Sequence, residues 1–465
     1  MEWMSDPGYW CSRWLFQRTF ALVYLVAFVV ALNQFRALAG TRGLTPAPRY
    51  LATHSWRRAP SIFQWHYSDR CFGVVAWTGI ALSALALAGG TDLVPEPVAM
   101  LVWAALWVLY LSIVNIGQAW YSFGWESLLL EIGFLAIFLG NGDTAPPILM
   151  LLLLRWIVFR LEFGAGLIKM RGDRCWRDLT CLYYHHQTQP LPGPLSWYFH
   201  HLPRPLHRVE VAANHVAQLV VPFLLFLPQP IAGVAAAIVA ITQLWLVVSG
   251  NFSWLNALTI VLALSVLPGW WFPVSGPDTT PLPMWHNVLQ LIVGAGVVLL
   301  SYAPVRNLLS SKQLMNASFS PLHLVNTYGA FGSITRTRYE IIVEGSRDGT
   351  RWHAYEFKAK PGDLRRRPPQ IAPYHLRLDW LMWFAAISPA YAKSWFAPFV
   401  AKLLDGDAAT LKLLRSNPFP DAPPVYVRAE LYEYRFTDRR ERRATGCWWA
   451  REHVGQFLPP VHKAS

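Results

Sequence analysis

Long apolar segments follow one another through the first 303 residues and constrain the fold of this chain more than any other feature. A helix needs ~20 mostly apolar residues to cross a bilayer, and about nine segments approach that length. Two of them, 124–140 and 252–269, are short enough to be re-entrant or buried, so we expect about eight to ten spans. The other seven are 13–33, 72–90, 98–115, 147–163, 208–227, 230–249 and 285–303.

The composition is that of a membrane protein. Hydrophobic residues make up 54% of the chain and charged residues 14%, whereas soluble domains average about 25% charged residues. The net charge is +13, which in so apolar a chain indicates contact with anionic lipid headgroups rather than nucleic acid. Leu15–Ala31 is not followed by a small-residue cleavage site, so we expect a retained helix and not a secretory signal.

The pattern changes after Tyr302. Residues 335–344, 351–358 and 425–436 are rich in β-branched and aromatic residues and predict strands. Asp348-Gly349 between the first two is a hairpin signal, because glycine accepts the positive φ that such turns need.

The second part of the chain also contains a predicted amphipathic helix at 375–386, whose Trp380 we expect against the bilayer surface. The fold class is therefore a multi-pass α-helical bundle with a C-terminal extramembrane β-rich domain. The bundle takes residues 1–303, including the polar loops 34–70 and 164–207. Residues 304–465 form the β-rich domain with its amphipathic helices.

Charged residues inside the apolar segments are costly unless they are paired or hydrated. We interpret them as an internal ion-pair network that holds the bundle, with the two α-helical glutamates of 124–140 as partners for the arginines of 147–163. A proton path is the less favoured interpretation. The members of the expected network are Glu126, Glu131, Arg155, Arg160 and Glu162.

The loop 164–207 opens with a dense group of charged and aromatic residues that predicts a docking surface for the C-terminal domain or for a client, because Trp and Arg are enriched in interface hot spots. Its members are Asp173, Arg174, Trp176, Arg177 and Asp178. Cys175 and Cys181 lie in the same loop and form a disulfide if it faces an oxidising compartment. Two free thiols are an equally good interpretation.

Lys169 has two interpretations. It follows Gly164-Ala165-Gly166, small residues that let a backbone or a ligand approach closely. A lysine desolvated there would be a usable base. A snorkelling lysine, whose ammonium reaches the headgroups, is the more common outcome at a helix end.

Several histidines lie in and just after the loop 164–207, but their pattern does not predict a metal site. Adjacent histidines do not present their rings to one ion as i,i+4 pairs do, and no HExxH motif occurs. No cofactor is expected. The absence of a GxSxG motif excludes a lipase of the α/β-hydrolase type. The histidines are His185, His186, His200, His201, His207 and His215.

Long ordered motifs resemble the lipase maturation factor family. They include NIGQAWYSFGWESLLLEIGFLAIFLG (115–140), the segment RWIVFRLEFGAGLIKMRGDRCWRDLTCLYYHHQTQPLPGP (155–194), TRYEIIVEGSRDG (337–349) and PPQIAPYHLRLDWLMWFAA (368–386). The resemblance covers about residues 60 to 460. It implies a multi-pass protein of the endoplasmic reticulum membrane that helps secreted lipases to fold, assemble and leave that compartment, as a chaperone and not as a known enzyme.

The Ala-, Arg-, Pro- and Trp-rich composition is similar to that of a bacterial homologue, which would place the chain in the inner (plasma) membrane. A second, shorter similarity joins FGAGLIKMRGDRCW to the vitamin K-dependent gamma-carboxylase family. There the lysine is implicated as a base, and the matching position is Lys169. This similarity supports an alternative function, a membrane-embedded enzyme acting on a lipid-soluble substrate.

Topology is predicted in two conflicting ways. With nine spans, both long loops and the C-terminal domain lie on one face, opposite the N-terminus. The positive-inside rule makes that arginine-rich face cytoplasmic, whereas the family resemblance implies the non-cytoplasmic side.

Overall fold

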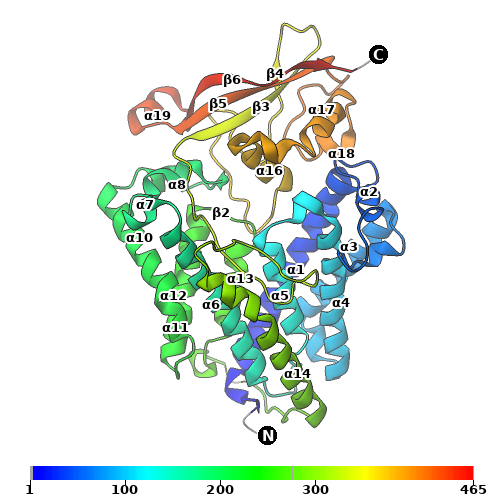
Figure 1. Cartoon of the computed structure of the whole chain (residues 1–465), viewed down its shortest axis with the longest axis vertical. Coiled ribbons are helices and arrows are strands. Elements are labelled where there is room, and N and C mark those ends of the chain that lie inside the picture. The colour runs from blue at the N-terminus through cyan, green and yellow to red at the C-terminus, as the bar shows by residue number, and fades with distance from the viewer. Residues whose placement is uncertain (1–3, 275, 464–465) are drawn as a thin grey trace.

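Helices form one end of the molecule and a sheet covers the other (Figure 1). The computed structural model describes residues 4–274 and 276–463. The N-terminus lies at the bundle end far from the sheet, and the chain ends on the sheet itself (Figure 1).

The bundle is built around α1 (Trp10–Ala39), which packs against α3 (Asp69–Ala88) and α13 (Leu255–Leu264). Phenylalanine and alanine side chains of α1 are fully buried in the main hydrophobic core. The remaining bundle helices are α4 (Glu96–Ile116), α5 (Gly124–Ala136), α6 (Ile148–Arg171), α10 (Arg204–Leu219), α11 (Val221–Leu224), α12 (Ile231–Ser249), α14 (Met284–Leu300) and α15 (Tyr302–Leu309).

Among the described residues, five helical stretches are long and apolar enough to cross a membrane. They contain α1, α3, α4, α12 and the consecutive pair α14–α15. The chain is thus a helical membrane protein, with fewer self-sufficient spans than the nine apolar segments suggested.

The other four apolar segments do not form long apolar helices of this kind, and the reason can be identified for each. Helix α5 has 13 residues and α13 has 10, both too short for a ~20-residue span. Nearly every residue of α5 is buried, as in a core helix. Helix α6 is long but carries several charges, and the segment 208–227 is divided into α10 and α11 at Val220.

The loop 164–207 is ordered into short helices that lie beside α10, close to the sheet end (Figure 1). Its strand β1 (Leu191–Pro192) pairs antiparallel with β2 (Gly250–Asn251) after α12, which fixes the end of the loop to the bundle. The loop helices are α7 (Arg174–Arg177), α8 (Leu182–Thr188) and α9 (Ser196–His200), and the loop 34–70 contains α2 (Ala47–Leu51).

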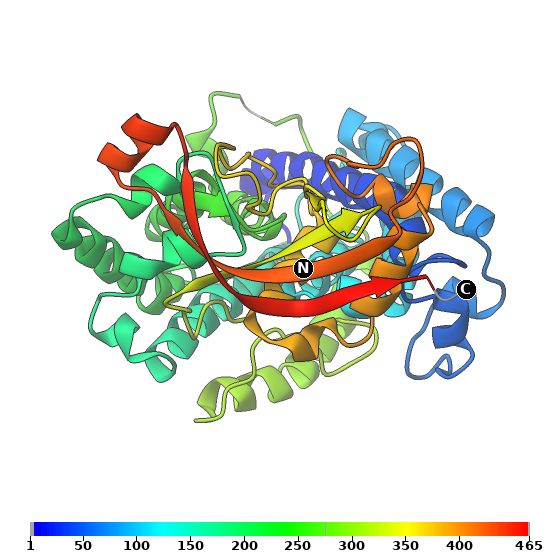
Figure 2. The same cartoon turned by 90° about the horizontal axis from the view of Figure 1, so that it is seen from above.

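Four antiparallel strands in the order β4-β3-β5-β6 form the sheet, and their long axes run across the top of the bundle (Figure 2). Strand β3 pairs with β5 without interruption from Arg338↔Tyr434 to Ser346↔Tyr426. The predicted strand 351–358 is reduced to the two residues of β4, and β6 was not predicted at all. The strands are β3 (Arg338–Ser346), β4 (His353–Ala354), β5 (Tyr426–Phe436) and β6 (Trp449–His462).

Helix α16 (Arg377–Ile387) packs against β3 and lies between the sheet and the bundle (Figure 1). The side chain of Trp380 is 4% exposed, and its ring lies 4.9 Å from that of Trp125. The expectation that Trp380 meets the bilayer surface was therefore wrong, because the bundle offers it an aromatic contact. The other helices of this region are α17 (Phe396–Leu404), α18 (Ala408–Leu411) and α19 (Arg439–Thr445).

The arrangement predicts a labelling pattern. Cysteines replacing Arg57, Arg204 and Arg347, all exposed at the sheet end, should react with an impermeant maleimide from one side of the membrane only. A cysteine at the exposed Asp278, in the loop before α14, should react from the opposite side. The free Cys11, Cys71 and Cys447 are first changed to Ser. Reaction of the three arginine positions from different sides would contradict this topology.

Candidate functional site

A linker (residues 324–336) crosses the helices α5 and α6 before it enters the sheet. It lies so close to α6 that a Cβ on Gly164 would come within 2.5 Å of the Tyr328 carbonyl oxygen. A Cβ on Gly172 would overlap the carbonyl oxygen of Gly332. The glycines of this stretch therefore serve a close backbone approach, one of the two roles that the sequence suggested, here to the chain's own linker.

A buried ion pair joins the linker to the bundle. Arg160 pairs with Glu131, and both side chains are 1% exposed. Asn326 and Tyr328 of the linker donate hydrogen bonds to the same carboxylate at 2.8 and 2.6 Å. Arg160 in turn donates to the Asn326 carbonyl oxygen at 2.6 Å. The linker thus supplies hydrogen bonds to both members of the pair.

A second buried pair joins α16 to the bundle. Glu126 accepts a hydrogen bond from Tyr110 at 2.5 Å and pairs with Arg377 at 2.8 Å. The Arg377 guanidinium also lies 3.4 Å from the centre of the Tyr121 ring and donates to the Trp120 carbonyl oxygen. Glu126 is therefore neutralised from the C-terminal part of the chain.

Two members of the expected network have other partners. Arg155 does not pair with either glutamate, contrary to expectation, and instead donates to the Tyr9 hydroxyl at 3.1 Å and the Leu225 carbonyl oxygen at 3.3 Å. Glu162 accepts a hydrogen bond from Gln243 at 2.7 Å. Arg155, in the N-terminal half of α6, thus donates to neutral oxygens and not to a carboxylate.

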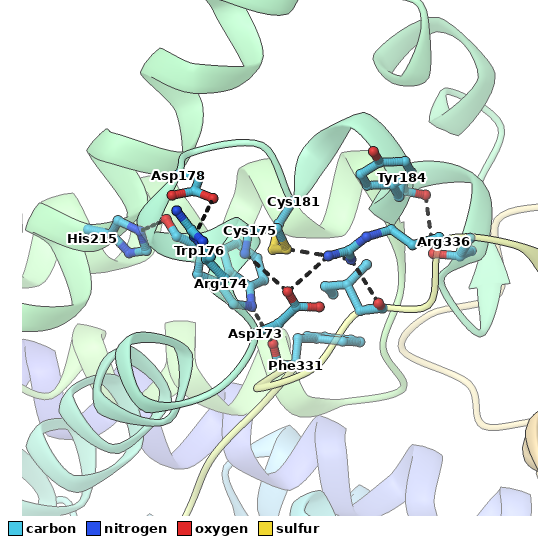
Figure 3. Close-up of a disulfide and its surroundings, with 12 residues drawn as sticks. Asp173, Arg174, Cys175, Trp176, Asp178, Cys181, Tyr184, His215, Phe331 and Arg336 are labelled. Carbon is cyan, nitrogen blue, oxygen red and sulfur yellow. Dashed lines mark hydrogen bonds and ion pairs between the residues drawn. A yellow bond between two sulfur atoms is a disulfide. The ribbon is translucent and has the colours of Figure 1, made fainter.

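The loop after α6 is closed by a disulfide between Cys175 and Cys181 (Figure 3). Asp173 caps α7 by accepting from the Cys175 amide and also accepts from Arg336 at the end of the linker, at 2.9 Å. The hydrogen bond from Arg336 lowers the pKa of Asp173 below its usual value. Asp173 thus docks the linker against the loop.

Trp176 is an internal residue of this loop. It is 4% exposed and donates from its indole nitrogen to the Phe331 carbonyl oxygen at 2.7 Å (Figure 3). The expectation of an exposed Trp176 was wrong, because the linker covers its ring. What remains exposed is one charged face, made of Arg174, Arg177 and Asp178. Arg174 and Asp178 pair at 3.2 Å.

Lys169 points inward. Its ammonium donates to the side-chain oxygens of Asn214 and Gln218 on α10, each at 2.8 Å. It also lies 4.8 Å from the centre of the Trp176 ring. The residue is 6% exposed, so the snorkelling interpretation was wrong. Lys169 joins α6, α10 and the disulfide loop.

Few sequence signals pointed to the residues that complete these contacts. Arg377 was visible as a lone arginine between Leu376 and Leu378 in the predicted amphipathic helix, which was the only available signal. Asn326 and Tyr328 lie in a segment for which no element was predicted, and Arg336 lies at the start of the predicted strand 335–344, whose pattern gave no sign of its contact with Asp173.

Comparison with known protein families finds one match for the helical bundle and another for the C-terminal region. Residues 11–272 match the lipase maturation factor transmembrane domain, and residues 324–459 match the lipase maturation factor C-terminal domain. The chain belongs to the lipase maturation factor family. The second match begins at the first residue of the linker, and the resemblance seen in the sequence is confirmed.

Relatives match over nearly the whole chain. Lipase maturation factor 1 of Bos taurus is 43% identical over 98% of this chain and 90% of its own length. The Homo sapiens protein of the same name is 42% identical over 97% of this chain and 88% of its own length. Lipase maturation factor 2 of Gallus gallus is 30% identical over 97% of this chain and 81% of its own length. No solved structure matches this family member.

The buried pair predicts a stability cycle in this maturation factor homologue. Arg160→Met leaves the Glu131 carboxylate unpaired and should lower the free energy of unfolding by roughly 3–5 kcal/mol. The double variant Arg160→Met with Glu131→Leu should recover part of that loss, because no lone charge remains. The measurement is unfolding of the purified protein in detergent.

The control is Arg174→Met, which removes an exposed partner of Asp178 and should cost only about 0–1 kcal/mol. Equal stability of wild type and Arg160→Met would contradict the assigned role of the buried pair.

Proposed function

We propose that this protein is a membrane-bound maturation factor that assists the folding, assembly and export of a secreted lipase. The observation that carries the proposal is 43% identity to lipase maturation factor 1 over 98% of the chain. Both family domains match, and the second match begins with the linker. The partners are then membrane lipids and a secreted lipase client.

We place the client contact on the exposed face formed by Arg174, Arg177 and Asp178. The disulfide, the Asp173–Arg336 hydrogen bond and the buried Trp176 hold this face in one conformation. A preorganised surface loses less conformational entropy on binding than a mobile loop. Arginines at a rim also speed encounter with a partner of opposite charge.

The finer architecture is part of the same proposal. All nine apolar segments lie at membrane depth, with α5 and α13 in the core of the bundle and the α10–α11 pair at its edge (Figure 1). The division near residue 303 leaves the β-rich part outside the membrane. An odd number of crossings is supported by the opposite positions of the N-terminus and the sheet (Figure 1). The membrane is that of the endoplasmic reticulum, or the inner membrane in a bacterium.

The enzyme alternative has less support. A catalytic base needs a free lone pair facing a substrate, whereas Lys169 donates to two amide oxygens and lies against Trp176. The cavity of about 570 Å³ beside α6 is lined by other residues, among them Trp156, Tyr302 and Arg306.

Deletion of this protein tests the proposal directly. The activities of secreted lipases in the medium should fall, while their transcripts and an unrelated secreted hydrolase stay unchanged. Restoration by the wild-type chain completes the test. Undiminished activity of every secreted lipase in the deletion strain would reject the maturation role.

Charge reversal tests the client face. Arg174→Glu with Arg177→Glu should reduce lipase secretion by about tenfold or more while the protein stays folded, since exposed substitutions change stability by only about 0.5 kcal/mol. The matched control, Arg439→Glu with Arg440→Glu, reverses two exposed arginines on α19. Full secretion by the Arg174/Arg177 variant would exclude this face.

Substitution of Lys169 separates the two functions. Arginine keeps the donors to Asn214 and Gln218 and stacks well on Trp176, so Lys169→Arg should retain most lipase secretion. A base must lose its proton near neutral pH, which arginine does not do. Loss of secretion in well-folded Lys169→Arg would instead favour the enzyme.

A further inference from the structure

Three potential metal ligands meet between the disulfide loop and the bundle. His186 comes from α8, and His207 and Glu210 come from the first turns of α10. One ligand atom from each side chain lies within 4.8 Å of the other two. His207 and Glu210 are three positions apart on one helix, so they share a face, and that face is turned toward His186 of α8.

The two imidazoles are buried without adequate partners. His186 and His207 are each 1% exposed. Neither ring nitrogen of His186 has a hydrogen-bond partner in the described part of the chain, and neither has Nδ1 of His207. A polar group buried without a hydrogen bond costs free energy. A bound ion would remove that cost for both rings at once.

The surroundings orient the ligand atoms. Nε2 of His207 lies 3.4 Å from the His200 carbonyl oxygen. If Nε2 carries the proton for that contact, Nδ1 presents its lone pair toward Glu210, 3.9 Å away. The Trp245 indole donates to Oε1 of Glu210 at 2.6 Å, which leaves Oε2 to face His207. Such outer partners are the usual supports of metal ligands.

The donor set matches zinc. Two imidazole nitrogens and one carboxylate oxygen, with a fourth position for water, are a known zinc arrangement. Zinc bonds of ~2.0–2.2 Å hold the ligand atoms roughly 3.3 Å apart, so the three side chains must move inward by about an ångström to bind it. Glu210 is 18% exposed, which gives water access to the fourth position.

We propose that His186, His207 and Glu210 bind one Zn²⁺ ion that joins α8 to α10. Adjacent histidines do not present both of their rings to one ion, but this does not exclude a site that uses only one of the two rings. Here the His185 ring packs against Phe331, and His186 alone faces α10. The site is structural, since it fastens the disulfide loop to the bundle from the side opposite the linker.

The test uses the full-length protein without a polyhistidine tag, purified in detergent, stripped with EDTA and dialysed against ZnCl₂. Elemental analysis should find one zinc per chain. Glu210→Gln keeps the acceptor for Trp245 but removes the charge, and should weaken zinc binding by ~10–100-fold or more. His207→Gln should do the same, whereas His66→Gln, an exposed histidine in the loop 34–70, should bind zinc as the wild type does.

Thermal unfolding shows whether a variant has lost zinc binding or has failed to fold. Without zinc, wild type and Glu210→Gln should unfold at the same temperature. Added zinc should raise that temperature for the wild type and the His66→Gln control only, because a ligand stabilises the state that binds it. Less than one zinc per chain at saturation, or equal zinc affinity of wild type and Glu210→Gln, would overturn the proposal.

Discussion

The carboxylates of Glu126 and Glu131 on α5 are buried in the bundle, and neither is satisfied without residues from beyond position 320. Glu131 depends on Asn326 and Tyr328 in addition to Arg160, and Glu126 depends on Arg377. Burying an unpaired carboxylate costs several kcal/mol. The helical bundle and the C-terminal region are therefore parts of one folded unit, although two family domains describe them separately.

The same dependence positions the charged face. The linker that satisfies Glu131 continues to Phe331, where it accepts the Trp176 hydrogen bond, and then to Arg336, which contacts Asp173. The residues that contact the buried pair and those that contact the disulfide loop thus lie in one short stretch of chain, the linker. Displacement of the linker would disturb both, which couples the stability of the bundle to the shape of the loop.

Periodicity and composition predicted what is local in this fold. Long apolar runs became helices, and 425–436 became β5 almost to the residue. Charge and length showed that α5 and α13 were unusual, but only packing could decide that α5 is a core helix. Strand β6 escaped prediction because it is an edge strand with Pro459-Pro460 and many exposed polar residues, which do not alternate clearly. Arg160 was expected as a partner of the α5 glutamates, and it pairs with Glu131. The partners from beyond position 320 escaped because each is remote in sequence, and one chain contains no signal that pairs them; they are Asn326, Tyr328, Phe331 and Arg377.

The linker contacts also impose an order on biosynthesis. Helix α5 is complete once synthesis has passed Ala136, but the hydrogen-bond donors to Glu131 from Asn326 and Tyr328 lie 195 and 197 positions after Glu131. Until those residues are synthesised, Arg160 and Tyr110 are the partners that the first half of the chain offers to the α5 carboxylates. The contacts around α5 are therefore complete only when the second half of the chain arrives. A truncated chain ending before the linker would leave those contacts permanently incomplete and would be exposed to the quality-control systems of its membrane.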